Sequence, residues 1–367
     1  MITNYPEKAT LKEVLSSNLS SSALKAICKS NGVFLLSPEK ETVIRDAHLF
    51  YWGFTDINAI SSQMDDEKNY KKSFRLKLNF EPSETTPNAF DAIYSAINNY
   101  RNSAITPERI SFESFNAVIK DGEQILAGEV SYVRRKPGKV ELLSEVTQRF
   151  SFQAKCPTEN DINIDFIFND RSDVGIAKKI INTAIAVTDS IKPPVQISLK
   201  PLKISERVEL FDRFFTYSFQ DWRLLSLQDI KISDGQENNE DGIEQETLAQ
   251  SILSGIKSAQ LSGTGLRSNP IVIQAVAKGY FFPKATIRFE HKREAQQIVV
   301  DVAFNTDDLL LEINMITTFE VEDERPYKHP MLIDDQKIVL ENFHNAIQEL
   351  YGQILAERAE NGAEDIT

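Results

Sequence analysis

The strongest constraint on the fold is a pattern of strand-like runs closed by a helix, which occurs twice along the chain. Runs in which apolar and polar residues alternate are followed by one amphipathic stretch, at 109–190 and again at 281–359. Alternation with a period of two predicts half-buried strands, and short spacings between the runs predict antiparallel hairpins. The sequence therefore predicts two antiparallel meanders, each covered by a helix, although no residue-level repeat accompanies them.

Turn and helix signals divide this pattern into elements. Asp121-Gly122 and Pro137-Gly138 are turn sequences between strands, and a helix is expected to end before Pro193-Pro194. We expect strands at about 72–80, 109–120, 124–134, 139–155, 161–168, 222–232, 281–291, 297–305 and 309–321. We expect helices at about 88–101, 173–190, 205–217, 245–259 and 335–359, after three short helices within residues 8–52.

The fold class that follows from these elements is α+β, with a small N-terminal helical module, two antiparallel meanders flanked by helices, and a long C-terminal helix. The length of 367 residues favours about two to three domains. We predict the helical module at 1–66, an α+β domain with an antiparallel sheet at 67–233, and a second α+β domain at 245–367. Residues 234–244 are expected to be a polar linker or loop.

Residues that carry chemistry are sparse. The chain has 4 His and 2 Cys, and none stand at the spacing of metal ligands. Cys28 and Cys156 cannot form a disulfide framework, so reduced thiols are expected. The sequence opens without a basic and apolar leader and has no run of about 18 apolar residues, so we expect a cytoplasmic protein without a membrane partner. We expect no cofactor and no bound metal.

The charge is unevenly distributed along the chain. The net charge of −13 argues against a protein that is coated with nucleic acid over its whole surface. However, residues 251–300 carry an excess of Lys and Arg, whereas residues 301–367 carry an excess of Asp and Glu. A local basic face beside an acidic C-terminal region is therefore expected, and the acidic region can repel nucleic acid or dock a basic partner.

The N-terminal segment combines two helical patterns with several cations. The first, Ala23-Leu-Lys-Ala-Ile-Cys-Lys, stops at Asn31-Gly32, a sequence that favours the left-handed end of a helix. Ser37-Pro38-Glu39 is a strong helix start, and Lys40-Glu-Thr-Val-Ile-Arg45 follows it. These signals predict a helix, an extended connection and a second helix.

This stretch resembles the SAP-type helix–extended–helix motif over about residues 22–46. That family pairs a leucine-bearing first helix with a glycine turn, and such modules often bind DNA through basic residues at the helix starts. The matching cations here are Lys25, Lys29, Lys40 and Arg45. The chain departs from the family at Pro38-Glu39, where a glycine is usual, and at Arg45, which directly follows the aliphatic pair. A small helical bundle used for docking is the alternative.

A second basic stretch, residues 257–293, has aromatic residues interleaved with its cations. Cations neutralise phosphates, and aromatic faces stack on exposed bases. Its candidate nucleic-acid-binding residues are Lys284, Arg288, Lys292 and Arg293. Phe281 and Phe282 would point to opposite faces of a strand, so at least one is expected in the core. A solvated sheet face beside an acidic tail is the alternative explanation.

Two short strings fit the acid-x-Lys element of metal-dependent nucleases. They are Asp229-Ile-Lys231 and Glu290-His-Lys292. In that chemistry paired carboxylates hold Mg²⁺, while the lysine helps to activate water or stabilises the developing charge. A further acid upstream on a neighbouring strand is also required. Asp229, Lys231, Glu290 and Lys292 are therefore an alternative catalytic set.

The C-terminal helix has the most regular periodicity of the chain. Its apolar residues recur at every third or fourth position, at Leu340, Phe343, Ile347, Leu350 and Ile354. Such a seam either packs on the second sheet or forms an interface with a partner helix or a second copy of the chain. The bulky Phe343 favours packing on a sheet.

These observations predict a non-catalytic subunit or adaptor of an intracellular macromolecular complex. It would bind a protein partner, and the two basic stretches make nucleic acid the second partner to test. The reasons are the lack of a catalytic signature, the uneven charge and the amphipathic helices. A Mg²⁺-dependent nuclease and a structural or assembly protein, which would form homo-oligomers, are the alternatives.

Overall fold

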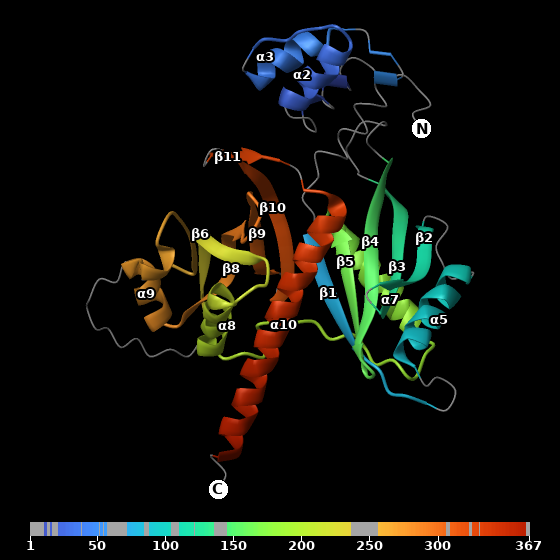
Figure 1. The fold of residues 1–367 in the computed structure, drawn as a ribbon, viewed down its shortest axis with the longest axis vertical. Helices are drawn as coiled ribbons and strands as arrows, with labels where there is room; N and C mark the ends of the chain where they lie inside the picture. Colours follow the sequence, from blue (N-terminus) through green and yellow to red (C-terminus); the bar gives the residue numbers. More distant parts are fainter. Residues whose placement is uncertain are drawn as a thin grey trace. The chain divides into compact units, whose positions relative to one another are not determined.

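The computed structural model describes most of the chain. The described residues are 11–12, 15–16, 21–37, 39–50, 52–53, 55–56, 72–83, 88–103, 110–120, 122–135, 145–235, 256–305, 309–322, 325–329 and 331–364. The chain forms two compact units, one of residues 1–69, 107–111 and 130–149, and one of residues 70–106, 112–129 and 150–367. The protein is α+β, with an antiparallel sheet and a long C-terminal helix (Figure 1).

The N-terminal module contains two short helices, α2 (Ser21–Ser30) and α3 (Lys40–Ala47). Gly32 has a φ of +76° and its N–H donates to the carbonyl of Lys29, so the chain leaves α2 through the left-handed turn that glycine favours. A small core holds the helices together and includes Leu24, Val43 and Trp52. The helix–extended–helix arrangement is thus present, whereas the first of the three predicted helices lies largely outside the described residues.

The strands pair into one sheet of eleven strands. They are β1 (Lys72–Asn79), β2 (Ile110–Lys120), β3 (Glu123–Arg135), β4 (Glu145–Thr158), β5 (Asp161–Phe168), β6 (Trp222–Asp234), β7 (Ser258–Ser262), β8 (Tyr280–His291), β9 (Gln296–Asn305), β10 (Leu310–Glu322) and β11 (Arg325–Lys328). Their order is β2-β3-β4-β5-β1-β10-β9-β8-β6-β7, and β11 pairs with β10. The other helices are α5 (Ala89–Asn102), α7 (Ser172–Ile185), α8 (Ile204–Thr216), η1 (Leu266–Ser268), α9 (Pro270–Ala277) and α10 (Ile333–Glu364).

The two predicted meanders meet edge to edge through β1 and β10. The registered pairs between these strands are Lys72 with Asn314 and Ser73 with Ile313. We call β2, β3, β4, β5 and β1 the first half-sheet, and the strands from β10 to β7 the second half-sheet. Paired residues of neighbouring strands share a face, so Ser73 and Ile313 define one common face of the whole sheet.

The two half-sheets are covered on opposite faces. On the common face the second half-sheet is apolar, and Phe343 of α10 lies 4.9 Å from Phe289 of β8, between ring centroids. On the other face the first half-sheet is apolar, and Phe74 stacks on Phe166 at 4.8 Å. Helices α5 and α7 pack on that face, while α10 crosses β1 and β10 on the common face (Figure 1). Among the described helices, none forms a layer over the polar face of either half-sheet.

The apolar seam of α10 lies in the core of this chain. Of the two alternatives for this seam, packing on the second sheet is therefore the one observed. Its members Leu340, Phe343, Ile347, Leu350 and Ile354 are all buried in the cluster that includes the second half-sheet. The same cluster contains α8 and β6, which the sequence analysis grouped with residues 67–233. The predicted domain boundaries stay a prediction, but the second half-sheet uses residues from both sides of 234–244.

Three local expectations differ from the structure. The helix predicted at 245–259 is wrong at its C-terminal end, because strand β7 begins at Ser258 and pairs with β6. The earlier part of that prediction cannot be compared, since residues 236–255 lie outside the described part. Helix α9 was not predicted, although Asn269 caps it and Pro270 is its first residue. Strand β11 was also not predicted. Within the described part of the chain, no helix is long and apolar enough to cross a membrane.

Candidate functional site

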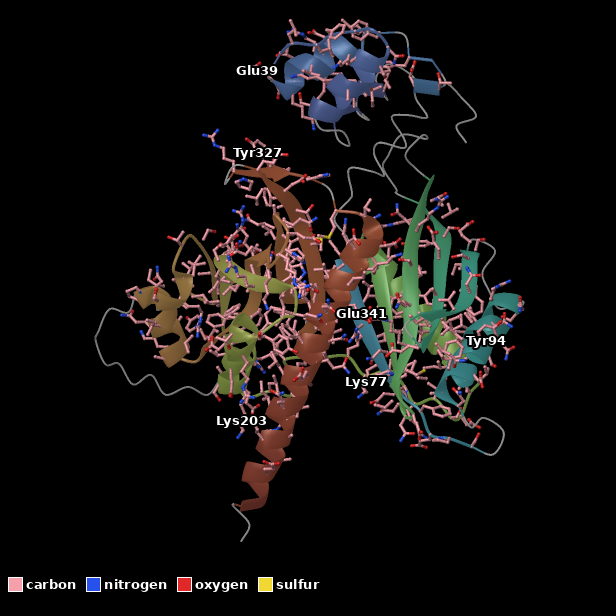
Figure 2. The ribbon with its side chains drawn as sticks, in the orientation of Figure 1. Glu39, Lys77, Tyr94, Lys203, Tyr327 and Glu341 are labelled. Carbon is pink, nitrogen blue, oxygen red and sulfur yellow. The ribbon has the colours of Figure 1, made fainter. Side chains whose placement is uncertain are left out.

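The main candidate site is the polar face of the first half-sheet where α10 lies beside it. Alternation along β1 and β5 places Ser73, Arg75 and Asp165 on this face, since their neighbours Phe74 and Phe166 face the opposite core. The apolar seam of α10 packs on the second half-sheet, and its flank points toward the first. Figure 2 shows Glu341 on this part of α10. We call this region the polar cleft.

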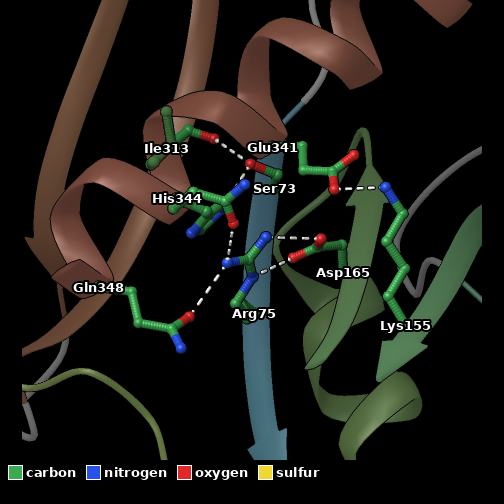
Figure 3. A network of polar contacts seen from close by, with 9 residues as sticks. Ser73, Arg75, Lys155, Asp165, Ile313, Glu341, His344 and Gln348 are labelled. Carbon is green, nitrogen blue, oxygen red and sulfur yellow. Dashed lines mark hydrogen bonds and ion pairs between the residues drawn. The ribbon is translucent and has the colours of Figure 1, made fainter. Parts of the chain in front are cut away.

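A buried ion pair forms the base of the polar cleft. Arg75 donates from Nε to Asp165 Oδ1 at 2.6 Å and from a terminal nitrogen to Oδ2 at 2.8 Å. The other terminal nitrogen donates to Asn345 at 2.6 Å and to Gln348 at 3.0 Å, both on α10 (Figure 3). The Arg75 side chain is only 4% exposed. Removal of one partner would leave a buried charge and typically costs about 3–5 kcal/mol, so this pair fixes β1 to β5. The hydrogen bonds from Arg75 to Asn345 and Gln348 join β1 to α10.

His344 is the second polar link between α10 and β1. Its Nε2 lies 2.9 Å from the Ser73 hydroxyl, which also lies 3.4 Å from the carbonyl oxygen of Ile313. Burial, and then the nearby charge of Arg75, lower the pKa of His344 well below its usual range, against a hydrogen bond with the Ser73 backbone. The imidazole is therefore neutral at neutral pH. Within the described residues its Nδ1 has no hydrogen-bond partner.

The Ser73–His344 pair does not form a nucleophilic dyad of the usual kind. A catalytic serine needs a base that a third group orients, and it needs access to substrate. Both side chains are 1% exposed, and in the described structure no carboxylate bonds to His344 Nδ1. The pair joins α10 to the sheet. No local sequence pattern predicts this pair, because 271 positions separate the two residues.

The cleft contains a cavity of about 170 Å³. Its wall includes Ser73, Ser114, Ser151, Gln153, Glu341 and His344. Beside it, Lys155 Nζ on β4 donates to Glu341 Oε1 on α10 at 2.5 Å (Figure 3). The arrangement can bind a small molecule through hydrogen bonds.

The predicted DNA-binding cations lie on the surface of the N-terminal module. Lys29, Lys40 and Arg45 are exposed, and Lys25 is half-buried. Arg45 pairs with Asp46 at 3.1 Å, with both side chains well exposed, so this pair contributes little to stability. The helices that carry these cations are present, and the family resemblance itself stays a prediction.

The same module has an exposed apolar surface, which the sequence analysis did not single out. In the extended connection, Val33 and Leu35 pack on the module core, whereas Phe34 and Leu36 are 68% and 90% exposed. Leu49, just after α3, is 63% exposed. A signal was available, because four consecutive apolar residues in an extended segment cannot all face one core.

The cations of the second basic stretch make contacts within the sheet. Lys284 pairs with Asp301 at 2.7 Å, and Lys292 donates to a backbone carbonyl. Arg288 lies 4.8 Å from the ring centroid of Phe319 and donates to Gln297. Arg293 is exposed. The aromatic residues are not a stacking platform, since Phe281 and Phe282 are both buried.

The acid-x-Lys residues lie on the second half-sheet. Asp229 accepts a hydrogen bond from Ser262, and Glu290 accepts one from Arg223 at 2.7 Å. Strand pairing places Asp229 and Asp301 on either side of Thr286, on the face without helices. Among the described residues there is no group of three or more His, Cys, Asp or Glu that could hold a metal ion. The catalytic set stays a prediction.

The comparisons with known proteins give no family. No family model matches the chain, and no curated protein matches it. Among solved structures, the crystal structure of DynU16, from the dynemicin biosynthetic locus, is 10% identical and covers 78% of this chain and 98% of its own. Its TM-score of 0.20 is too low to carry an argument.

Proposed function

We propose that this protein is a non-catalytic subunit or adaptor of a cytoplasmic macromolecular complex. It binds a protein partner through the exposed apolar surface that Phe34 and Leu36 form on the N-terminal module. Nucleic acid is the second partner to test, at the cations of the same module.

The observation that carries this proposal is the exposure of Phe34 and Leu36. Large apolar side chains at 68% and 90% exposure form a surface that water solvates poorly, and such surfaces commonly mark protein interfaces. Both project from a segment whose alternate residues are fixed in the module core, so they are presented on an ordered backbone. Bulky aromatic and apolar anchors carry much of the energy of typical interfaces.

The test is affinity purification of the full chain from cells that express it, with and without nuclease, followed by mass spectrometry. A stoichiometric protein partner that survives nuclease is expected. The double variant Phe34→Ser/Leu36→Ser should reduce its recovery about tenfold or more, because it removes two anchors. The matched control is Ile119→Ser/Val187→Ser, which removes two residues that are each 75% exposed outside this surface.

The outcomes separate the alternatives. Equal recovery with both double variants would reject the apolar surface as the docking site. If nucleic acid alone co-purifies, Lys29→Glu/Lys40→Glu should abolish its recovery, and binding should weaken steeply with salt. Self-association that persists at high salt would favour the structural or assembly alternative.

A further inference from the structure

The cavity of the polar cleft has a wall in which most charges are already paired. Arg75 and Asp165 form a bidentate pair, and Lys155 pairs with Glu341. Lys337 pairs with Asp334 at 3.1 Å, and His344 is neutral because burial and Arg75 lower its pKa. The remaining ionic group of the wall, Glu129, is a carboxylate. An anionic ligand would therefore find no matching countercharge, and a buried unpaired charge is costly.

The same wall is rich in groups that form hydrogen bonds with neutral molecules. Ser114 and Ser151 provide hydroxyls, and Gln153 provides an amide. Hydroxyls both donate and accept, and the Glu341 carboxylate can accept further hydrogen bonds from a ligand hydroxyl. Ile167 and Leu340 add apolar area on which the carbon skeleton of a ligand can rest.

The size of the cavity restricts the ligand. A volume of about 170 Å³ corresponds to roughly ten or more water-sized groups, at about 10–15 Å³ each. This is on the scale of one sugar ring with its hydroxyls. We infer that the polar cleft binds a small polyhydroxylated molecule of about monosaccharide size that carries no negative charge, held between the first half-sheet and α10. The site is independent of the docking surface on the N-terminal module.

The ligand would bridge two parts of the chain. The serines and Gln153 belong to the first half-sheet, whereas Leu340, Glu341 and His344 belong to α10, whose seam is buried against the second half-sheet. Binding therefore adds contacts between the two half-sheets, and it stabilises the folded protein by mass action.

The test uses the full chain with D-glucose, myo-inositol and glycerol as probes, at millimolar concentrations, in saturation-transfer NMR and thermal unfolding. Saturable binding of at least one probe and a raised Tm are expected. Ser151→Leu should weaken that binding about tenfold or more, because leucine fills the cavity and removes a hydroxyl. The matched control Ser226→Leu makes the same change on the polar face of the second half-sheet and should bind as the parent does.

An anionic analogue of the sugar tests the chemical class. Glucuronate should bind about tenfold more weakly than glucose. Lack of saturable binding by all three neutral probes would overturn the inference. So would binding that Ser151→Leu leaves unchanged while circular dichroism shows that variant to be folded, or tighter binding of glucuronate than of glucose.

Discussion

At the scale of single residues, the polar cleft departs from the simple pattern in which apolar side chains are buried and polar side chains are exposed. A buried arginine, aspartate and histidine occupy positions where apolar residues would be less costly to bury. Each is satisfied by contacts across elements, except for Nδ1 of His344. The hydrogen bonds between buried polar groups of this kind are strongly directional, so they fix how α10 lies on β1.

His344 should make stability depend on pH. Its folded pKa lies below the unfolded value of about 6.5, so below that pH the unfolded chain binds a proton that the folded chain does not. The free energy of unfolding should therefore fall as the pH drops from 6.5 toward 5, by up to about 1.4 kcal/mol per pH unit. Urea unfolding at a series of pH values measures this slope.

The comparison variant is His344→Gln, which retains a polar side chain without the titration. The charged groups of the cleft around His344 are present in both proteins; they are Arg75, Glu129, Lys155, Asp165, Lys337 and Glu341. The difference between the two curves therefore isolates the imidazole. Parallel curves for the parent and the variant would show that His344 is not the source of the slope.

At the scale of elements, the residue type at one strand position is restricted to glycine by the aromatic ring that packs on it. An ideal Cβ on Gly128 of β3 would lie 2.5 Å from Phe152 Cε1 and 3.0 Å from the backbone oxygen of Ser114. The Phe152 ring is itself buried, with its centroid 6.3 Å from that of Phe166. Any side chain at position 128 must therefore displace a packed ring.

Gly128→Ala should destabilise the protein by about 1–3 kcal/mol, the usual cost of overpacking a core. Chemical denaturation measures the loss. Phe152→Leu in the same chain should recover part of it, because the smaller side chain relieves the contact. The control is Gly175→Ala in α7, where a Cβ meets nothing within 4 Å and alanine should stabilise by up to about 1 kcal/mol. If Gly128→Ala and Phe152→Leu had additive effects on the free energy of unfolding, the expected clash between these two positions would be wrong.

Local patterns were sufficient to predict most of these elements. Strand β1 was predicted at 72–80 and is Lys72–Asn79, and the helix predicted at 88–101 is Ala89–Asn102. Strand β7 could not be predicted from its sequence, since it is a short strand at the edge of the sheet that is defined by its pairing with β6. The polar cleft could not be predicted either, because its elements β1, β5 and α10 are far apart in the sequence and no local pattern indicates that they meet.

At the scale of the whole molecule, the chain consists of two compact units with separate cores. Its two tryptophans divide between them: Trp52 is buried in the core of the N-terminal module, and Trp222 in that of the second half-sheet. Two-state unfolding is expected of each unit by itself.

Fluorescence should therefore detect two separate unfolding transitions. Trp222→Phe leaves Trp52 to monitor the N-terminal module, and Trp52→Phe leaves Trp222 to monitor the sheet. The module should show the weaker dependence on urea, because its small core exposes less surface when it unfolds. Coincident curves from the two variants would show that the units unfold cooperatively.

The coverage of the two half-sheets on opposite faces has a consequence for binding. Within the described part of the chain, the two polar surfaces lie on opposite sides of one sheet and point in opposite directions. Molecules bound to them would not collide, so the fold is suited to binding two partners at once without steric competition.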